Sequence, residues 1–368
     1  MPEYQTYDLG DFKLQGGGTL PGAWLAYKTF GDKSSPAVLY PSWYSGLISD
    51  NEWLIGEDKT LNPKKYFIII TALFGNSQSI SPSNSKIAPF PDVTFYDNVK
   101  AQHQLLTEGL GIKHLRAVTG WSMGAAQSFQ WATQYPNFMD ICVPFCGSAK
   151  TSLHNQVFLE GVKSALLAAK KTSSAGSTFG RVESKGSEAR TWTDEERTVG
   201  LKAFGRGYAG WGFSQAFYRE KLHEKSYGAK DLEDFMVTFW ETWALSKDPE
   251  NLLVMLHTWQ AGDVSKQEPY NGNFEQAMAA IKAKTLVLPS KTDLYFPPED
   301  SEYEVKNMSP GVGELDVYPS IWGHWAGGPP GNMEDVKWLD ERLARYFAEA
   351  PKRDGTEEVT DKMKKAEV

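Results

Sequence analysis

The feature that most constrains the fold of this chain is a serine between two glycines, in the segment Gly-Trp-Ser-Met-Gly at residues 120–124. Residues 114–119 form a short, mostly apolar run that predicts a buried strand. Residues 123–135 predict a helix that ends before Pro136, because proline lacks an N–H and disfavours helix in the residue preceding it. Since glycines allow a tight turn without a Cβ clash, the pattern places the Ser122 hydroxyl at the carboxyl end of a sheet strand.

A Gly-x-Ser-x-Gly segment between a strand and a helix is typical of the nucleophile elbow of α/β-hydrolases. The helix that begins behind Ser122 offers free N–H groups and the positive end of its dipole to an oxyanion. The alternative interpretation is a glycine-rich turn that happens to contain serine.

A serine hydroxyl becomes a good nucleophile when a histidine accepts its proton and a carboxylate fixes the histidine tautomer. In α/β-hydrolases with such an elbow, the three catalytic residues follow one another along the chain in the order serine, acid, histidine. His324 lies in a glycine- and proline-rich loop after the strand-like residues 314–318, where a catalytic base is expected. Asp293 follows the predicted strand at 285–290 and is the candidate acid, the alternative being a turn aspartate that bonds only its own backbone.

Three other histidines follow the candidate nucleophile in the chain. His154, just after the strand that follows the elbow helix, is a weaker second candidate for the base. His223 lies in a charged stretch and is expected in solvent, whereas His257 lies on an amphipathic helix and is expected to be packed or partly buried.

An oxyanion hole needs two backbone donors, and one should be the N–H of Met123, directly after the nucleophile. The second should come from the loop after the predicted strand at 37–40. Pro41 has no N–H to donate, which leaves Trp43 or Tyr44.

Several motifs together resemble the homoserine O-acetyltransferase branch of the α/β-hydrolase superfamily along most of residues 5–345. They are the elbow, Leu-Ala-Tyr-Lys-Thr-Phe-Gly at 25–31, the segment 90–102, Thr-Asp-Leu-Tyr-Phe-Pro-Pro-Glu at 292–299, and Gly-His at 323–324. The resemblance implies a triad of Ser122, Asp293 and His324, with Tyr44 as the second oxyanion donor. It also implies a homodimer formed through lid helices.

The chain departs from that family at positions that hold charge in the acetyltransferases. Trp325 stands where the family has an aspartate that helps to hold the substrate's amino group, and Tyr96 replaces an arginine. The family's histidine-containing loop reads Ser-Trp-Tyr at 42–44. These changes argue against homoserine and favour a neutral or aromatic acyl substrate, contacted by Trp43, Tyr96, Trp121 and Trp325.

The order of predicted elements indicates an α/β-hydrolase fold, with a mostly parallel central sheet, helices on both faces and a helical lid insertion. The core is predicted at residues 1–147 and 281–350, with the lid at 148–280 and a charged, disordered tail at 351–368. The lid is rich in aromatics, and its Phe235, Phe239 and Trp243 share one face of a regular helix.

Composition restricts the partners. A formal charge of −8 and the absence of a basic stripe argue against nucleic-acid binding, and no run of about 20 apolar residues could span a bilayer. Cys142 and Cys146 are four strand steps apart, roughly 13 Å, which is too far for a disulfide. With no signal-peptide pattern at the N-terminus, we expect a cytoplasmic protein that uses neither a metal nor another cofactor.

The sequence therefore supports a serine hydrolase that cleaves an ester, thioester or lactone through an acyl-enzyme on Ser122. An O-acyltransferase is the second hypothesis, with an acyl-CoA-type donor and an alcohol acceptor other than homoserine. A catalytically inactive binding module on the same scaffold is the third, because a fold alone does not imply function.

Overall fold

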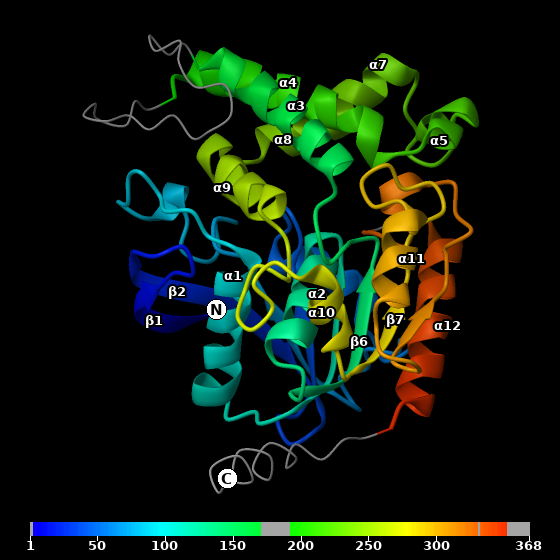
Figure 1. The fold of residues 1–368 in the computed structure, drawn as a ribbon. Coiled ribbons are helices and arrows are strands. Elements are labelled where there is room, and N and C mark those ends of the chain that lie inside the picture. Colours follow the sequence, from blue (N-terminus) through cyan, green and yellow to red (C-terminus); the bar gives the residue numbers. More distant parts are fainter. Residues whose placement is uncertain (1–2, 171–191, 330–331, 352–368) are drawn as a thin grey trace, which may run out of the picture.

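The computed structural model describes residues 3–170, 192–329 and 332–351, and its centre is one eight-stranded sheet (Figure 1). The spatial order is β1-β2-β4-β3-β5-β6-β7-β8. β1, β2 and β4 pair antiparallel, and the pairs from β4 to β8 are parallel. This confirms the mostly parallel sheet, whose strands are β1 (Gln5–Lys13), β2 (Thr19–Phe30), β3 (Ala37–Pro41), β4 (Phe67–Thr71), β5 (Leu115–Trp121), β6 (Met139–Phe145), β7 (Lys284–Val287) and β8 (Gly313–Leu315).

Helices cover both faces of the sheet because successive side chains of each central strand point to opposite sides. Val38 of β3 packs in the same cluster as helix α12 (Met333–Glu349). Leu39, the next residue, packs with residues of α1 (Phe95–Gln104) and α2 (Met123–Gln134) on the other face. The central strands are thus apolar on both sides, as their continuous hydrophobic runs predict.

A second group of helices lies beyond the carboxyl ends of the parallel strands and forms a cover over that edge (Figure 1). The cover, as the name is used below, consists of α3 (Leu153–Ala169), α4 (Asp194–Gly212), α5 (Gln215–Arg219), α6 (Leu222–Lys225), α7 (Leu232–Phe235), α8 (Thr242–Leu245) and α9 (Pro249–Gln260). It occupies most of the insertion predicted at 148–280.

The end of that insertion belongs with the core instead. Helix α10 (Phe274–Ala279) contributes Phe274 and Met278 to the cluster that packs on the sheet face with α2. Helix α11 (Pro298–Lys306) follows β7 and lies beside β8. Except for Pro351, the tail predicted at 351–368 lies outside the described residues.

The face of Phe235, Phe239 and Trp243 packs on the core cluster, although the helix that carries it is not regular, and the expectation that His223 is solvated is wrong. Residues 236–241 form a π-helical turn, which inserts one extra residue into the helix and shifts its inward face. Phe235 and Trp240 are therefore fully buried, whereas Phe239 and Trp243 are only partly buried. His223 is also buried rather than solvated, because its ring packs near the rings of Phe217, Tyr218 and Phe235.

Candidate active site

The turn between β5 and α2 holds Ser122 in a conformation that L-residues rarely adopt, with φ of +58°. The turn is possible because its neighbours are glycines. A Cβ on Gly120 would lie 2.4 Å from the backbone of Gly124, and a Cβ on Gly124 would lie 2.6 Å from the carbonyl oxygen of Pro41. The glycines around Ser122 are thus required by close backbone approach, as the elbow pattern predicts.

The structure brings Ser122, His324 and Asp293 together from three loops at the carboxyl edge of the sheet. The Ser122 Oγ and His324 Nε2 are 2.9 Å apart, and His324 Nδ1 is 2.8 Å from Asp293 Oδ2. All three residues are at most 4% exposed. A buried imidazole bonded on both sides has a fixed orientation, which is what proton transfer from a serine requires.

The Asp293 carboxylate is oriented by the loop that follows it. Its Oδ1 accepts hydrogen bonds from the backbone N–H groups of Tyr295, at 2.7 Å, and Phe296, at 3.2 Å. Asp293 therefore bonds its own backbone, as the turn interpretation expects, and its second oxygen still reaches His324. The two interpretations of Asp293 are compatible.

His324 is held by its neighbours in sequence and by Trp121, the last residue of β5. The indole N–H of Trp121 donates to the His324 carbonyl at 3.1 Å, and the two rings stack with centroids 4.8 Å apart. The N–H of Gly323 donates to Thr292 Oγ1 at 3.0 Å, which ties the histidine loop to the loop of Asp293.

Met123 follows Ser122 directly, and the loop that carries Tyr44 is bonded to α2 through Ser42. Met123 is the first residue of α2, so its N–H has no acceptor four residues earlier in the helix. The N–H of Gly46 donates to the carbonyl of Trp43 at 3.0 Å and closes a turn. Tyr44 is the second residue of this turn, and its N–H takes no part in the hydrogen bond that closes it. Gln127 of α2 holds the loop close by donating to the Ser42 carbonyl at 2.8 Å.

Of the four predicted substrate contacts, three are adjacent and one is elsewhere. The Trp121 ring contacts Trp43 at 4.9 Å and Trp325 at 5.6 Å, both edge-on. The carbonyl of Tyr96 instead accepts from Gln134, the last residue of α2, whereas Ser122 precedes the first residue. A helix of this length separates its ends by roughly 16 Å, so Tyr96 lies away from the triad.

His154, the second candidate for the base, also lies away from the nucleophile. It is exposed on α3, and its ring packs on Trp211 of the cover.

Sequence reasoning missed the aromatic residues that close the site from above. Tyr295 packs edge-on against the His324 ring at 4.7 Å and also contacts Tyr208 of α4 and Trp259 of α9. The ring of Tyr44 stacks on Tyr208 at 6.0 Å. Tyr295 lies two residues after the predicted acid, which is a usable signal, whereas no local pattern marks Tyr208 or Trp259.

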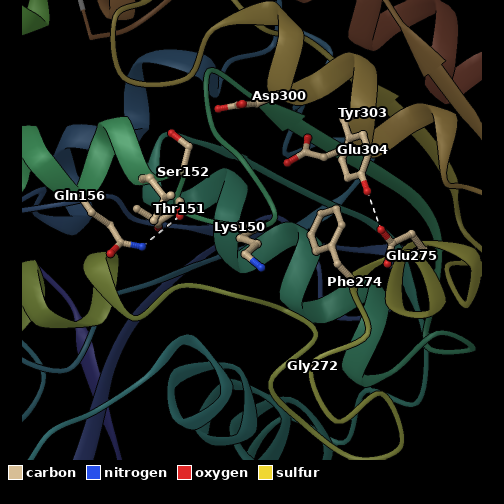
Figure 2. Close-up of a pocket in the computed structure, with 11 residues that line it drawn as sticks. Lys150, Thr151, Ser152, Gln156, Gly272, Phe274, Glu275, Asp300, Tyr303 and Glu304 are labelled. Atoms are coloured by element: carbon tan, nitrogen blue, oxygen red, sulfur yellow. Dashed lines mark hydrogen bonds between the residues drawn. The ribbon is translucent and has the colours of Figure 1, made fainter.

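A cavity of about 470 Å³ lies between the start of α3 and α11 (Figure 2). Glu304 is buried at its wall and accepts a hydrogen bond from the N–H of Ala149 at 2.5 Å. Burial raises the pKa of Glu304 well above its ordinary value. Lys150 at the same cavity pairs with Asp263.

Within the described ranges, no group of three or more histidine, cysteine or acidic side chains is placed to hold a metal ion. The same residues include no helix long and apolar enough to cross a membrane. Cys142 and Cys146 are both buried and free, as their strand spacing predicts.

Comparisons with known proteins show the family of the chain. A family model described as the alpha/beta hydrolase fold matches residues 42–181. The chain is 34% identical over 333 residues to a probable esterase of Corynebacterium glutamicum, which covers 87% of this chain and 89% of that protein. It is 35% identical over 330 residues to an ethyl acetate hydrolase of Pseudomonas veronii, with the same coverages of 87% and 89%.

A crystal structure of an acetylester hydrolase from Corynebacterium glutamicum matches with a TM-score of 0.84 and 32% identity, over 94% of this chain and 96% of that one. The homoserine O-acetyltransferase of Nostoc punctiforme is 27% identical and covers 88% of this chain and 91% of that protein, which confirms the resemblance read from the motifs. With more than one relative above 30% identity along most of its length, the chain belongs to the α/β-hydrolase family.

Proposed function

We propose that this protein is a serine ester hydrolase whose acyl-enzyme forms on Ser122 and whose substrates are acetyl esters of small, uncharged alcohols. The observation that carries the proposal is His324 bonded to Ser122 on one side and to Asp293 on the other. The names of the two relatives above, an acetylester hydrolase and an ethyl acetate hydrolase, support the acetyl group. Aromatic rings around the triad support an uncharged alcohol.

In the proposed mechanism His324 takes the proton of Ser122 as the oxygen attacks the ester carbonyl. The N–H groups of Met123 and Tyr44 hold the oxyanion, an effect worth about 3 kcal/mol for each donor. His324 then protonates the departing alcohol, and the acyl group remains on Ser122. Water then attacks the acyl carbon and gives a proton to His324. The bond from that carbon to the Ser122 Oγ breaks, His324 returns the proton to Ser122, and the acid leaves.

The test is intact-protein mass after incubation with a fluorophosphonate, together with hydrolysis of p-nitrophenyl acetate. We expect one adduct and ester turnover in the wild type, and neither in Ser122→Ala. Turnover that survives in Ser122→Ala would overturn the assignment of the nucleophile. No adduct and no turnover in the folded wild type would favour a binding module.

O-acyl transfer is the second candidate, because the aromatic cover buries the triad and the relatives include acetyltransferases. An acyl-CoA-type donor would then acylate Ser122, and an alcohol would replace water in the second step. Product analysis with an alcohol acceptor present separates the two functions. Transfer product that outpaces free acid would favour the transferase.

A homodimer through the cover is part of the proposal. Leu153 and Val157 of α3 are 81% and 68% exposed, and a Cβ on Gly161 of α3 would meet nothing within 4 Å. Glycine inside a helix is destabilising by about 1 kcal/mol relative to alanine, and no neighbour among the described residues requires glycine at position 161. Gly210 of α4 has the same open surroundings. Small residues beside exposed apolar ones allow a second copy to pack closely.

Light scattering tests this interface. We expect a dimeric mass for the wild type and a monomeric mass for Val157→Asp, with Lys163→Asp on the same helix as the control that leaves the dimer intact. A monomeric wild type would contradict the interface.

We also propose a cytoplasmic location, which the two free, buried thiols support. The cover is proposed to act as a lid over the triad.

A further inference from the structure

Two buried hydrogen-bond donors beside the triad have no acceptor among the described residues. They are the hydroxyl of Tyr295 and the indole Nε1–H of Trp259. Both residues are 1% exposed. Buried polar groups in folded proteins are usually hydrogen-bonded. Other buried atoms of the described residues also lack a partner, but these two donors belong to neighbouring rings beside the catalytic histidine.

The rings that carry the two donors lie beside the triad and beside the loop of the oxyanion hole. The Tyr295 ring packs on His324 with centroids 4.7 Å apart, and Trp259 contacts Tyr295 at 5.6 Å with perpendicular rings. Trp259 also contacts the ring of Tyr44 at 5.7 Å. The pair therefore spans the space between the catalytic base and the loop of the oxyanion hole.

The hydroxyl of Tyr208 does not remove the need for an acceptor. It interacts with the Tyr295 hydroxyl, and each is buried. When two hydroxyls bond each other, one donates its proton and the other accepts it. The proton of the accepting hydroxyl remains free to bind another oxygen. At least one O–H and one N–H therefore remain to bind an oxygen that none of the described residues supplies.

Ester hydrolysis brings such an oxygen to this side of the triad. In the first step the Ser122 Oγ–carbon bond forms, the bond from that carbon to the alcohol oxygen breaks, and the serine proton passes through His324 to the alcohol. In the second step water attacks the same carbon and the serine bond breaks. The alcohol oxygen leaves, and the water oxygen enters, beside His324.

We propose that the free O–H of the Tyr208–Tyr295 hydroxyl pair and the Trp259 N–H bind this oxygen, stabilising the departing alcohol oxygen in the first step and holding the attacking water in the second. The inference rests on the proposed ester hydrolysis and adds a binding site for the alcohol oxygen. This oxygen site suits the enzyme to alkyl esters, whose alkoxide leaving groups need stabilisation, rather than to activated aryl esters.

The leaving group provides the test. In Tyr295→Phe, Trp259→Phe and the double variant Tyr208→Phe/Tyr295→Phe, we expect kcat/KM for ethyl acetate to fall on the order of 10- to 100-fold. The same constant for p-nitrophenyl acetate should fall by less than about threefold, because nitrophenolate is a stable leaving group. A merely structural role would lower both constants together.

Tyr40→Phe is the matched control, since the Tyr40 hydroxyl is also buried and unpartnered among the described residues but belongs to β3 in the core. It should leave the ratio of the two constants unchanged. Equal losses for both esters, or no loss for ethyl acetate in any variant, would overturn the oxygen site. Failure of the wild type to hydrolyse either ester would instead reject the proposed function.

Discussion

The sheet edge and the cover meet at the triad, and they are built from different interactions. The sheet edge holds its groups by directed hydrogen bonds, such as those from Tyr295 and Phe296 N–H to Asp293. The cover packs against these groups with aromatic side chains. The ring of Tyr208, for example, contacts Tyr44, Tyr295 and several aromatic rings of the cover helices. Ring packing fixes position less strictly than a network of hydrogen bonds does.

The difference indicates a division of roles. Backbone amides and glycine turns fix the atoms that exchange protons, because the chemistry tolerates displacements of well under 1 Å. Apolar rings exclude water and shape the space for a substrate. Changes at the sheet edge should therefore abolish chemistry without unfolding the protein, whereas changes in the cover should alter stability and selectivity.

The largest expected effect is at the nucleophile. Ser122→Ala should lower kcat for p-nitrophenyl acetate by about 10⁴- to 10⁶-fold, because the remaining acceleration comes only from binding and the oxyanion hole. Steady-state rates and urea unfolding of the same samples provide the measurement. A stability loss comparable to that of a core variant would show that the two regions are not separable in this way.

Asp293→Asn should cost about 10³- to 10⁴-fold in kcat, since an amide donates where the carboxylate accepts and so favours the wrong histidine tautomer. The Tyr295 and Phe296 amides can still bond the remaining carbonyl oxygen. Glu299→Gln, at the start of α11, is the control with the same chemical change outside the triad. A loss below tenfold in Asp293→Asn would contradict the proposed role of the acid.

Trp240→Ala tests the cover. Trp240 is fully buried and packs on Phe213 and Trp325, so its removal should lower the free energy of unfolding by about 3–5 kcal/mol. The fluorophosphonate should still label Ser122 in the folded variant. Loss of labelling in protein with native circular dichroism would mean that the cover also positions the triad.

The smallest expected effect is at the junction of the two regions, at the buried Glu304 (Figure 2), which accepts a hydrogen bond from the N–H of Ala149. Burial raises the pKa of Glu304, so its contribution to stability is complete below the unfolded pKa, about 4.3, and is lost as the pH rises through the folded pKa. Glu304→Gln cannot ionise and keeps an acceptor. Its stability relative to wild type should increase by about 1 kcal/mol or more between pH 4.5 and pH 8.

Thermal melts at both pH values provide the measurement for Glu304→Gln. Glu275→Gln at the same cavity is the control of opposite sign, because its hydrogen bond with Tyr303 lowers the pKa of Glu275. A stability difference between Glu304→Gln and wild type that does not change with pH would show that Glu304 is ionised in the folded protein.

The elbow, the order of the three catalytic residues along the chain and the central sheet were predictable, because each depends on a local signal in the sequence. Glycines mark the turn at Ser122, and apolar runs mark the buried strands β3 and β4. The burial of His223 was not predictable, since its charged neighbours in sequence are not its neighbours in space. Nor was the π-helical turn, which depends on how Trp240 fits among other rings.

By itself, the sequence determined the family and the three residues that lie hydrogen-bonded at the sheet edge, because turns, caps and strands are encoded over a few consecutive residues. Only the tertiary structure decided which side chains face that triad from the cover. Tyr208, Trp259 and Tyr295 come from separate segments, and the contacts between their rings depend on helix packing. Two donors without an acceptor among the residues that the structure describes are likewise a property of the assembled site, since no residue carries that information alone.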